Sequence, residues 1–540
     1  MEPPAVFEEL CRAMARPDFY PHPATPLECR ETHISAVFLA GAWVYKLKKP
    51  VDFGFLDFRT LEARRHFCER EVLLNQRLTH EVYEQVVAIG RDETGRFRLD
   101  GGEPVAYAVK MQRLPDEVCM VALLRQGMVT RGHTEQLGEH LASFYAEGAS
   151  SPEISHFGDP QVIAFNLEEN FQQLEPFVGG VLERERWEFI REASRAFFLH
   201  RRELFEARLR DGRIRDGHGD LRTEHVYLHR GIQIIDCIEF NDRFRYGDVA
   251  SDLAYLHMDL EALGYPGVSR EVLAAYVKHA DDFGLYAVLD FYATYRALVK
   301  VKVACLRATE IVEPQARHSS EATACEYLAH AYRYALQFSR PTLWVFSGLP
   351  ASGKSVLAEK LAQALSLPLF QSDRLRKEGS DHAVAEEAVV PFGEGHYRLP
   401  WRQRTYARLF ALAQDTLKNG RSAILDATFS RAKWREEARQ LATDLDTNII
   451  FVECVCGEET LRTRLAQRQP GSSLSDARLE HLPEMLEAFE PLAEVAADTH
   501  LRLDTEQPPH ASFLDLLATG YVRQCAQIKQ VCQRMAGSPC

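Results

Sequence analysis

One segment of the chain has the residue types and the spacing of a phosphate-binding loop. It fits the pattern GxxxxGK[ST] without a gap, and its members are Gly348, Leu349, Pro350, Ala351, Ser352, Gly353, Lys354 and Ser355. In such a loop, glycines let backbone amides approach phosphate oxygens, the lysine reaches the β- and γ-phosphates, and the hydroxyl binds Mg²⁺. The segment therefore predicts a site for ATP and Mg²⁺, in which Lys354 also takes part in catalysis.

Four further residues in the same half of the chain could complete this chemistry. Asp426 ends an apolar, strand-like stretch, where a carboxylate would hold Mg²⁺. Asp373 follows another apolar run and could accept the proton of a substrate hydroxyl. Arg464 and Arg468 lie on one predicted helix, whose positive face could contact the transferring phosphoryl group. The structural alternatives are aspartates that cap a strand or a helix, and arginines that face solvent.

Four segments around these residues resemble the small P-loop kinases of the zeta-toxin, gluconate-kinase and polynucleotide-kinase group: SGLPASGKS, QSDRLRKE, AILDATF and LRTRLAQR. The resemblance covers about residues 341–505. It implies an AAA-type P-loop kinase that phosphorylates a hydroxyl group of a small molecule. The phosphate-binding loop is specific for this group, whereas the substrate-side residues are generic and leave the acceptor open.

The N-terminal half carries a second set of carboxylates with a spacing suited to phosphoryl transfer. HGDL at 218–221 precedes a predicted short strand pair, and Asp236 ends the second of those strands. Asp220 could orient or deprotonate an acceptor hydroxyl, and Asp236 could hold Mg²⁺ on a nucleotide. Upstream, Lys46 lies on a predicted strand and Glu71 on the next helix, which is the order of a lysine that grips phosphates and a glutamate that positions it.

Three motifs in this half resemble those of the aminoglycoside phosphotransferase (APH)-like kinases, a branch of the protein-kinase-like fold: HGDL at 218–221, IID at 234–236 and GDxxxDLA at 247–254. The likeness covers roughly residues 34–308. It implies a catalytic aspartate, a metal ligand, a phosphate-binding lysine and its glutamate partner at Asp220, Asp236, Lys46 and Glu71. It also implies that residues 111–114 contact adenine. We expect His218 to be an orienting residue that packs against the Asp236 segment, and Asp248 and Asp252 to brace the catalytic loop or cap a helix.

Two features depart from the APH-like pattern. The family has Asn five residues after the catalytic aspartate as its second metal ligand, and this chain has His225 in that position. Imidazole is a poorer Mg²⁺ ligand than an amide oxygen, so the second metal position is left open. Glu239 is an alternative to Asp236 as metal ligand, and Lys48 could replace Lys46 because both lie on one face of the predicted strand.

These residues require two different scaffolds. Up to residue 338 the chain shows strands with one helix and then mainly helices, and after residue 341 strands and helices alternate. We therefore predict an α+β protein-kinase-like (APH-like) bilobal domain at 1–338, with lobes at about 30–113 and 114–338. An α/β P-loop NTPase domain with a parallel sheet is predicted at 341–508.

The rest of the chain and its composition limit the class of protein. Residues 509–540 have apolar side chains at helical spacing, so we expect an amphipathic helix that packs on the chain itself, with a homodimer as the alternative. A chain of 540 residues exceeds one hydrophobic core, and a net charge of −14 argues against nucleic-acid binding. The absence of a signal-like or membrane-spanning stretch and of zinc-like cysteine spacing favours a cytoplasmic protein.

Together the two motif sets predict a bifunctional phosphotransferase that transfers the γ-phosphoryl group of ATP to small-molecule hydroxyls. Their order along the chain resembles bacterial fusion proteins described as aminoglycoside phosphotransferase-like with an ATP-binding domain. The alternative is a nucleotide-sensing regulatory protein, in which one ATP site is a non-catalytic module that gates the other. His225, in place of the expected Asn, is the residue that motivates this alternative.

Overall fold

The residues that the computed structural model describes are 4–54, 56–378, 399–467 and 477–536. The chain forms two compact units, the first made of residues 1–163 and 208–280 and the second of residues 164–207 and 281–540. The predicted kinase domain contributes to both units, and its boundaries remain a prediction. No helix within the described part of the chain is long and apolar enough to cross a membrane.

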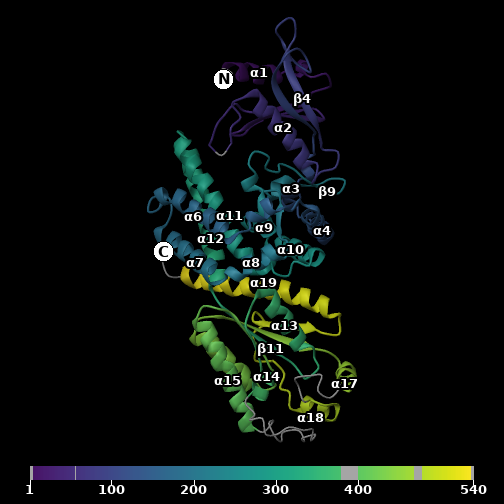
Figure 1. The fold of residues 1–540 in the computed structure, drawn as a ribbon, viewed down its shortest axis with the longest axis vertical. Helices are drawn as coiled ribbons and strands as arrows, with labels where there is room; N and C mark the ends of the chain where they lie inside the picture. Colours follow the sequence, from purple (N-terminus) through teal and green to yellow (C-terminus); the bar gives the residue numbers. More distant parts are fainter. Residues whose placement is uncertain (1–3, 55, 379–398, 468–476, 537–540) are drawn as a thin grey trace. The chain divides into compact units, whose positions relative to one another are not determined.

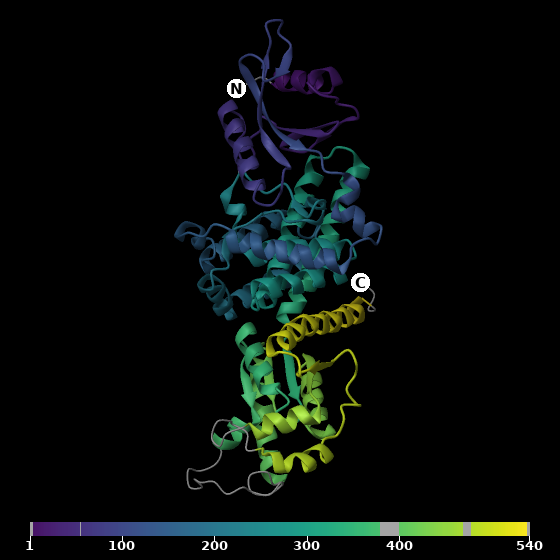
Figure 2. The same cartoon turned by 90° about the vertical axis from the view of Figure 1, so that its right-hand side faces the viewer.

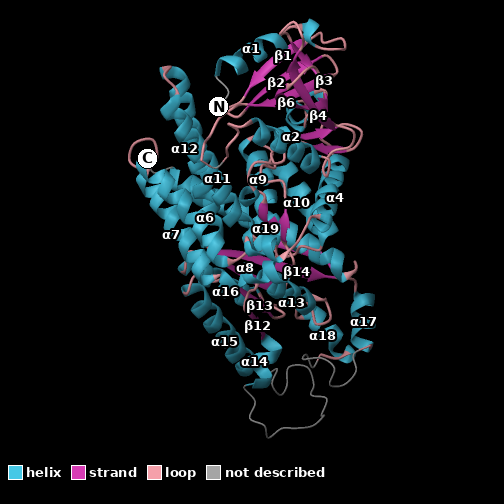
Figure 3. Cartoon of the chain, turned by 45° about the horizontal axis from the view of Figure 1, so that its top comes forward, coloured by secondary structure: helices cyan, strands magenta, loops and turns pink. Residues whose placement is uncertain are grey.

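A six-stranded antiparallel sheet, in the order β1-β2-β3-β6-β4-β5, belongs to the first unit (Figures 1 and 3). Its strands are β1 (Leu27–Glu31), β2 (Ser35–Ala40), β3 (Trp43–Lys48), β4 (Tyr83–Arg91), β5 (Phe97–Leu99) and β6 (Pro104–Gln112). Tyr45 and Leu47 of β3 are buried in one hydrophobic cluster with Phe38. Because side chains alternate along a strand, Lys46 and Lys48 lie on the opposite face of β3.

Helix α2 (Leu61–Asn75) packs on β4 and β6 and brings Glu71 to the face that carries the two lysines. The hydroxyl of Thr60 caps this helix by accepting a hydrogen bond from the backbone N–H of Ala63. Helix α1 (Pro4–Met14) contributes Leu10 and Met14 to the hydrophobic cluster on the other face of the sheet. The sheet thus has one apolar face and one face that carries charged groups.

Two short antiparallel strand pairs flank the remaining motifs of the first unit. They are β7 (Ile214–Asp216) with β10 (Tyr246–Asp248), and β8 (Val226–Leu228) with β9 (Ile232–Ile234). Besides α1 and α2, the helices of this unit are α3 (Met120–Arg125), α4 (Arg131–Glu147), α5 (Pro152–His156), α9 (Val249–Ala262) and α10 (Pro266–Ala280). The residues of α6 (Pro160–Leu174) and α8 (Arg202–Arg210) are divided between the two units. The strand pair predicted after Asp220 is confirmed as β8 and β9.

A five-stranded parallel sheet, in the order β12-β13-β11-β14-β15, organises the second unit and confirms the predicted α/β fold. Its strands are β11 (Thr342–Ser347), β12 (Leu369–Gln371), β13 (Ala423–Asp426), β14 (Asn448–Val455) and β15 (His500–Asp504). The carboxyl ends of neighbouring parallel strands meet at one edge. The phosphate-binding loop, Asp373 and Asp426 follow or end three neighbouring strands, so the sheet gathers them at that edge.

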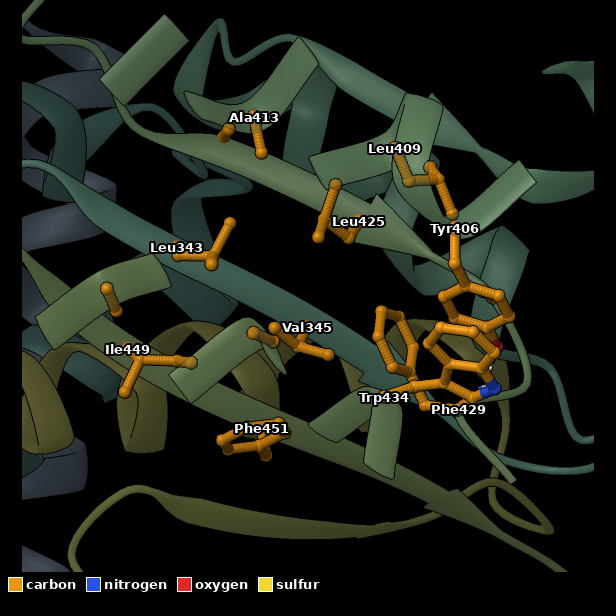
Figure 4. Close-up of a cluster of buried hydrophobic side chains, with 14 of the residues drawn as sticks. Leu343, Val345, Tyr406, Leu409, Ala413, Leu425, Phe429, Trp434, Ile449 and Phe451 are labelled. Atoms are coloured by element: carbon orange, nitrogen blue, oxygen red, sulfur yellow. Dashed lines mark hydrogen bonds between the residues drawn. The ribbon is translucent and has the colours of Figure 1, made fainter. Parts of the chain in front are cut away.

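The core of this unit lies between the sheet and helices α15 (Leu399–Lys418) and α16 (Ala432–Asp444). Leu343, Val345 and Leu425 from the sheet belong to the same buried cluster as Tyr406 and Trp434 from the helices (Figure 4). The rings of Tyr406 and Trp434 stack with their centroids 4.4 Å apart. This packing holds the sheet edge rigidly behind the loop residues.

Helix α19 (Pro509–Ala536) is the yellow helix near the C-terminus in Figure 2. It packs against β14, β15 and α13 (Lys354–Leu365). A Cβ atom added at Gly520 would lie 2.7 Å from Trp344 of β11, so this glycine permits the close approach of helix and sheet. The predicted amphipathic helix therefore packs on its own chain. The other helices of the unit are α7 (Arg184–His200), α11 (Leu285–Glu310), α12 (Pro314–Ser339), α13 (Lys354–Leu365), α14 (Ser372–Glu378), α17 (Glu458–Ala466) and α18 (Leu482–Glu487).

Candidate functional site

The first unit contains a buried group of alternating positive and negative side chains. Lys46 Nζ lies 2.5 Å from Asp236 Oδ1 and 2.8 Å from Glu71 Oε1. Lys48 Nζ lies 2.7 Å from Glu71 Oε2 and also binds Glu239. The Lys48 side chain is 0% exposed, whereas that of Lys46 is 13% exposed and its partner Asp236 is 44% exposed. Of the two lysines that the sequence left as alternatives, Lys46 is therefore the one that solvent reaches.

The charges in this group keep one another ionised. Burial alone would lower the pKa of Lys46, but the carboxylates of Asp236 and Glu71 outweigh it and raise that pKa well above its usual value. Burial would raise the pKa of Asp236, and the positive charge of Lys46 overrides it, so the pKa is lowered. Burial does raise the pKa of Glu239, the carboxylate that pairs with the buried Lys48. Lys46 and Asp236 thus form a charged pair at neutral pH.

The HGDL loop is tied to the segment that carries Asp236. The ring of His218 binds the carbonyl of Ile235 through Nε2 at 3.0 Å and the N–H of Asp220 through Nδ1 at 3.2 Å. Asp252 accepts the backbone N–H groups of His218 and Gly219 at 2.6 and 2.9 Å. Burial lowers the pKa of His218 to about 4, so its ring is neutral. His218 and Asp252 are placed to position the loop, as the sequence predicts.

Arg222, which the sequence analysis did not single out, holds the carboxylate of Asp220. Its Nε lies 3.1 Å from Asp220 Oδ1 and its Nη2 lies 2.9 Å from Asp220 Oδ2. Burial would raise the pKa of Asp220, but His225 and Arg222 lower it. The carboxylate is therefore ionised and oriented, as a proton acceptor must be. The only sequence signal for Arg222 is its position two residues after Asp220, within the catalytic motif.

A second set of ion pairs, also missed in the sequence, fixes helix α2 relative to the Asp236 segment. Asp242 binds Arg70 of α2 and accepts a hydrogen bond of 2.7 Å from Arg245 Nη2. Arg245 is buried, binds Asp216, and donates to the carbonyl of Ile238 at 2.9 Å. Because α2 carries Glu71, these contacts hold the partner of Lys46 in place.

Asp236 itself has a φ angle of 66°, a left-handed conformation that few residues other than glycine adopt. Its backbone N–H is bonded to the hydroxyl of Tyr83 at 3.2 Å. The neighbouring Cys237 N–H donates to Asn75 Oδ1 at 2.9 Å. Strained residues of this kind are concentrated at functional sites, where the surrounding contacts hold them.

In the second unit, the phosphate-binding loop connects β11 to α13 in the conformation that its glycines require. Gly348 has a φ angle of 145°, and a Cβ atom there would lie 2.6 Å from the carbonyl oxygen of Cys454. Gly353 has a φ angle of 86° and precedes the helix, which begins at Lys354. The free N–H groups of the first helical turn and the helix dipole favour an anion at this point.

A cavity of about 290 Å³ adjoins this loop. It is lined by residues of the loop, by the start of α13 and by residues that are distant in sequence. They are Ala351, Gly353, Lys354, Ser355, Val356, Leu357, Arg464, Thr505, Pro509 and Ser512. Arg464 donates hydrogen bonds to the carbonyls of Ala351 at 3.2 Å and Thr505 at 2.6 Å. Arg464 therefore lies at the loop and not in solvent, whereas Arg468 is outside the described residues.

Asp426 ends β13 with its carboxylate buried beside the loop. Its Oδ2 accepts a hydrogen bond of 3.2 Å from Gln371, and its Oδ1 has no hydrogen-bond partner among the described residues. Burial raises the pKa of Asp426, while Lys354 and Ser355 act in the opposite direction. An unsatisfied buried carboxylate oxygen beside a serine hydroxyl fits a hard cation such as Mg²⁺.

Asp373 lies in the first turn of α14, directly after β12, at the predicted edge of the sheet. Its Oδ1 is 3.0 Å from Arg376 Nη1, and its side chain is 29% exposed. The structure thus brings Asp373 to the same sheet edge as Asp426 and the loop. Within the described part of the chain, no three histidine, cysteine or acidic side chains form a metal cluster.

Comparisons with known proteins match one segment of the chain and, in one case, nearly all of it. Residues 343–492 match the AAA domain family. The chain is 31% identical over 495 residues to the uncharacterized protein Rv2004c of Mycobacterium tuberculosis (strain ATCC 25618 / H37Rv), covering 91% of this chain and 95% of that protein. It is 27% identical over 164 residues to a shikimate kinase of Rhodococcus jostii (strain RHA1), covering 30% of this chain and 89% of the enzyme.

Among solved structures, aminoglycoside 2'-phosphotransferase-IIIa is similar over 60% of this chain and 98% of its own, with 16% identity and a TM-score of 0.36. A gluconokinase from Sinorhizobium meliloti 1021 is similar over 35% of this chain and 96% of its own, with 19% identity and a TM-score of 0.26. The match at residues 343–492 agrees with the predicted AAA-type P-loop domain, and the two structural neighbours are kinases of the two kinds that the sequence resembles. With 31% identity over nearly its whole length, the chain belongs to the family of the mycobacterial protein Rv2004c.

Proposed function

We propose that the chain is an ATP-dependent phosphotransferase with two nucleotide sites, each of which transfers a γ-phosphoryl group to a small-molecule hydroxyl. One observation carries the proposal. Each unit has its own lysine beside a carboxylate near a strand end: Lys46 with Asp236, and Lys354 with Asp426. A kinase needs these two groups to grip the phosphates and to hold a cation.

In the first unit, Asp220 would orient the acceptor hydroxyl and take its proton. Arg222 supports this role because it holds both oxygens of the carboxylate. Lys46 would exchange its contact with Asp236 for the nucleotide phosphates, and Glu71 would keep the lysine in place through that exchange. The freed carboxylate of Asp236, with His225 nearby, would hold the cation.

In the second unit, the backbone amides of the loop would surround the phosphates, and Lys354 would contact the transferring group. Ser355 and Asp426 would hold Mg²⁺, since both present oxygen atoms at the loop. Asp373 would accept the proton of the acceptor hydroxyl. Arg464 would stabilise the loop through its hydrogen bond to the carbonyl of Ala351. When bound, Mg²⁺ supplies positive charge that neutralises the phosphate oxygens during transfer.

A nucleotide-sensing protein is the second candidate function, in which the first unit binds ATP without turning it over. Arg222 already pairs with Asp220 through three hydrogen bonds, and Lys46 already pairs with Asp236. A site whose charged groups satisfy one another could bind a nucleotide without completing the transfer. Tight ATP binding with no Asp220-dependent product would favour this candidate.

The test is to incubate the full chain with labelled ATP and a pool of metabolites, and to identify the labelled products. Lys354→Ala is expected to abolish transfer in the second unit and to leave products of the first unit. Asp220→Asn is expected to give the reverse pattern. Loss of both product sets in either variant would refute two independent sites, and unchanged products in Asp220→Asn would refute the role of Asp220.

A further inference from the structure

The ring of His225 is held in one tautomer by its neighbours. Its Nδ1 lies 2.9 Å from the backbone carbonyl oxygen of Asp220, which can only accept a hydrogen bond. Its Nε2 lies 3.3 Å from Arg222 Nη2, which can only donate one, and a cation at Nε2 would take the place of this contact. The proton must therefore be on Nδ1, and the lone pair of the ring on Nε2. A backbone carbonyl behind the ring is also the contact that orients histidines which bind metals.

The lone pair of His225 is close to the carboxylate of Asp236. His225 Nε2 is 3.7 Å from Asp236 Oδ2, and Lys46 contacts the other carboxylate oxygen, Oδ1. Neighbouring ligands of an octahedral cation lie about 3 Å apart, so a small closure would let both atoms bind one ion. The His225 side chain is 9% exposed and packs against the ring of His218, with the centroids 6.0 Å apart, which limits its other orientations.

One nitrogen ligand changes the choice of cation. Mg²⁺ binds oxygen ligands and takes imidazole poorly, whereas affinity for nitrogen ligands increases along the first-row transition metals from Mn²⁺ onward. Among these ions, Mn²⁺ also suits carboxylate and phosphate oxygens in an octahedral site. The second unit differs, because Ser355 and Asp426 offer oxygen atoms only.

We propose that the nucleotide site of the first unit selects Mn²⁺ over Mg²⁺, with Asp236 Oδ2 and His225 Nε2 as the protein ligands. The proposal rests on the proposed function, since it assumes that a metal–nucleotide complex binds at Asp236. The P-loop site of the same chain remains a Mg²⁺ site. The two sites would then respond to different cations, and a change in the Mn²⁺ supply would act on one of them.

The experiment uses the full chain with Lys354→Ala, which weakens the P-loop site, and a non-hydrolysable ATP analogue. Calorimetry measures the affinity for the analogue with Mn²⁺ and with Mg²⁺. Electron spin echo measurements on the Mn²⁺ complex detect a nitrogen atom bonded directly to the metal. We expect a nitrogen signal and tighter binding with Mn²⁺, and we expect His225→Asn to remove the signal and to reduce the preference by about tenfold or more.

His229→Asn is the matched control, because it makes the same change four residues away and should leave both readouts unaltered. Analogue binding without a nitrogen signal, or with the same Mn²⁺ preference in His225→Asn, would overturn the proposal and leave the phosphotransferase function intact. If the analogue binds with neither cation and Lys46→Met changes nothing, then the first unit has no nucleotide site. In that case the proposed function fails together with the metal assignment.

Discussion

Lys46 and Lys48 share one glutamate, but solvent reaches only one of the two lysines. The two lysines differ in burial. The ammonium group of Lys46 contacts Asp236, whose side chain is 44% exposed, whereas that of Lys48 contacts Glu71 and Glu239, which are both buried. A buried charge that loses its partner is costly, and an exposed one is hydrated instead. We therefore expect Lys46 to bind the ligand and Lys48 to stabilise the fold, although both lie on one face of the same strand.

Replacing each lysine by methionine should separate these roles. Lys48→Met leaves Glu71 with one lysine and Glu239 buried without its partner, so we expect a loss of about 3–5 kcal/mol in the free energy of unfolding, measured with urea. Lys46→Met should cost less stability and should abolish nucleotide binding by the first unit in calorimetry. Lys49→Met is the control, because its partner Glu31 is 64% exposed. Equal stability losses in the two variants would contradict this assignment.

His218 makes the stability of the first unit depend on pH. Burial lowers its pKa to about 4 in the folded chain, while an exposed histidine takes up a proton near 6.5. Between these values the unfolded chain binds more protons, so stability falls as the pH falls. We expect His218 to contribute up to about 3 kcal/mol of this loss. Unfolding curves of His218→Gln between pH 6.5 and 4 should be flatter than those of wild type or His229→Gln, and parallel curves would refute the prediction.

At the scale of elements, the close packing of helix α19 on the sheet depends on a glycine, which has no side chain. Helix α19 approaches β11 because Gly520 leaves room for the ring of Trp344, 2.7 Å from where a Cβ atom would lie. Gly267 of α10 offers the opposite case, since nothing lies within 4 Å of its Cβ position. The same substitution should therefore have opposite effects in the two helices.

We expect Gly520→Ala to destabilise the second unit by about 1–3 kcal/mol, because the helix or the Trp344 ring must move. Gly267→Ala should be neutral or should stabilise its helix by up to about 1 kcal/mol, as alanine favours helix more than glycine does. Thermal unfolding followed by circular dichroism measures both effects. A Gly520→Ala chain as stable as wild type would show that the contact is loose.

The parts of the two sites that sequence predicts are those encoded within short segments. The loop at Lys354, the strand that ends at Asp426 and the short strand before Asp236 need only a local pattern. Arg222 and Arg245 could not be predicted in this way, because an arginine does not show in sequence which carboxylate it will bind: Arg222 binds Asp220 two residues away, and Arg245 binds Asp216, which is 29 residues away. The sequence also could not decide whether Lys46 or Lys48 is the proposed phosphate-binding lysine, because the choice depends on burial, which only the packed structure reveals.

At the scale of the whole molecule, the net charge of −14 is a poor guide to what the chain binds. Each proposed site gathers its own positive groups, and their contacts lie within one compact unit: Lys46 and Arg222 in the first, Lys354 and Arg464 in the second. Local fields act over about 10 Å at ordinary ionic strength, so neither site depends on the total charge.

The number of nucleotides bound per chain should therefore follow the number of intact sites. We expect wild type to bind two ATP molecules, Lys46→Met and Lys354→Ala to bind one each, and the double variant to bind none, because each lysine contacts phosphate in its own unit only. Equilibrium dialysis at saturating ATP with Mn²⁺ and Mg²⁺ measures this. A wild-type value of one would show that one of the two sites does not exist.

Helix α19 has a practical consequence for inhibitor and fragment screening. Pro509 and Ser512 in its first turns line the cavity beside Lys354, and its middle covers Trp344 of the sheet. A shortened chain that stops at residue 508 would lose a wall of that cavity and expose an apolar sheet face. Screening on an isolated P-loop region would then report ligands for a surface that the complete protein never presents.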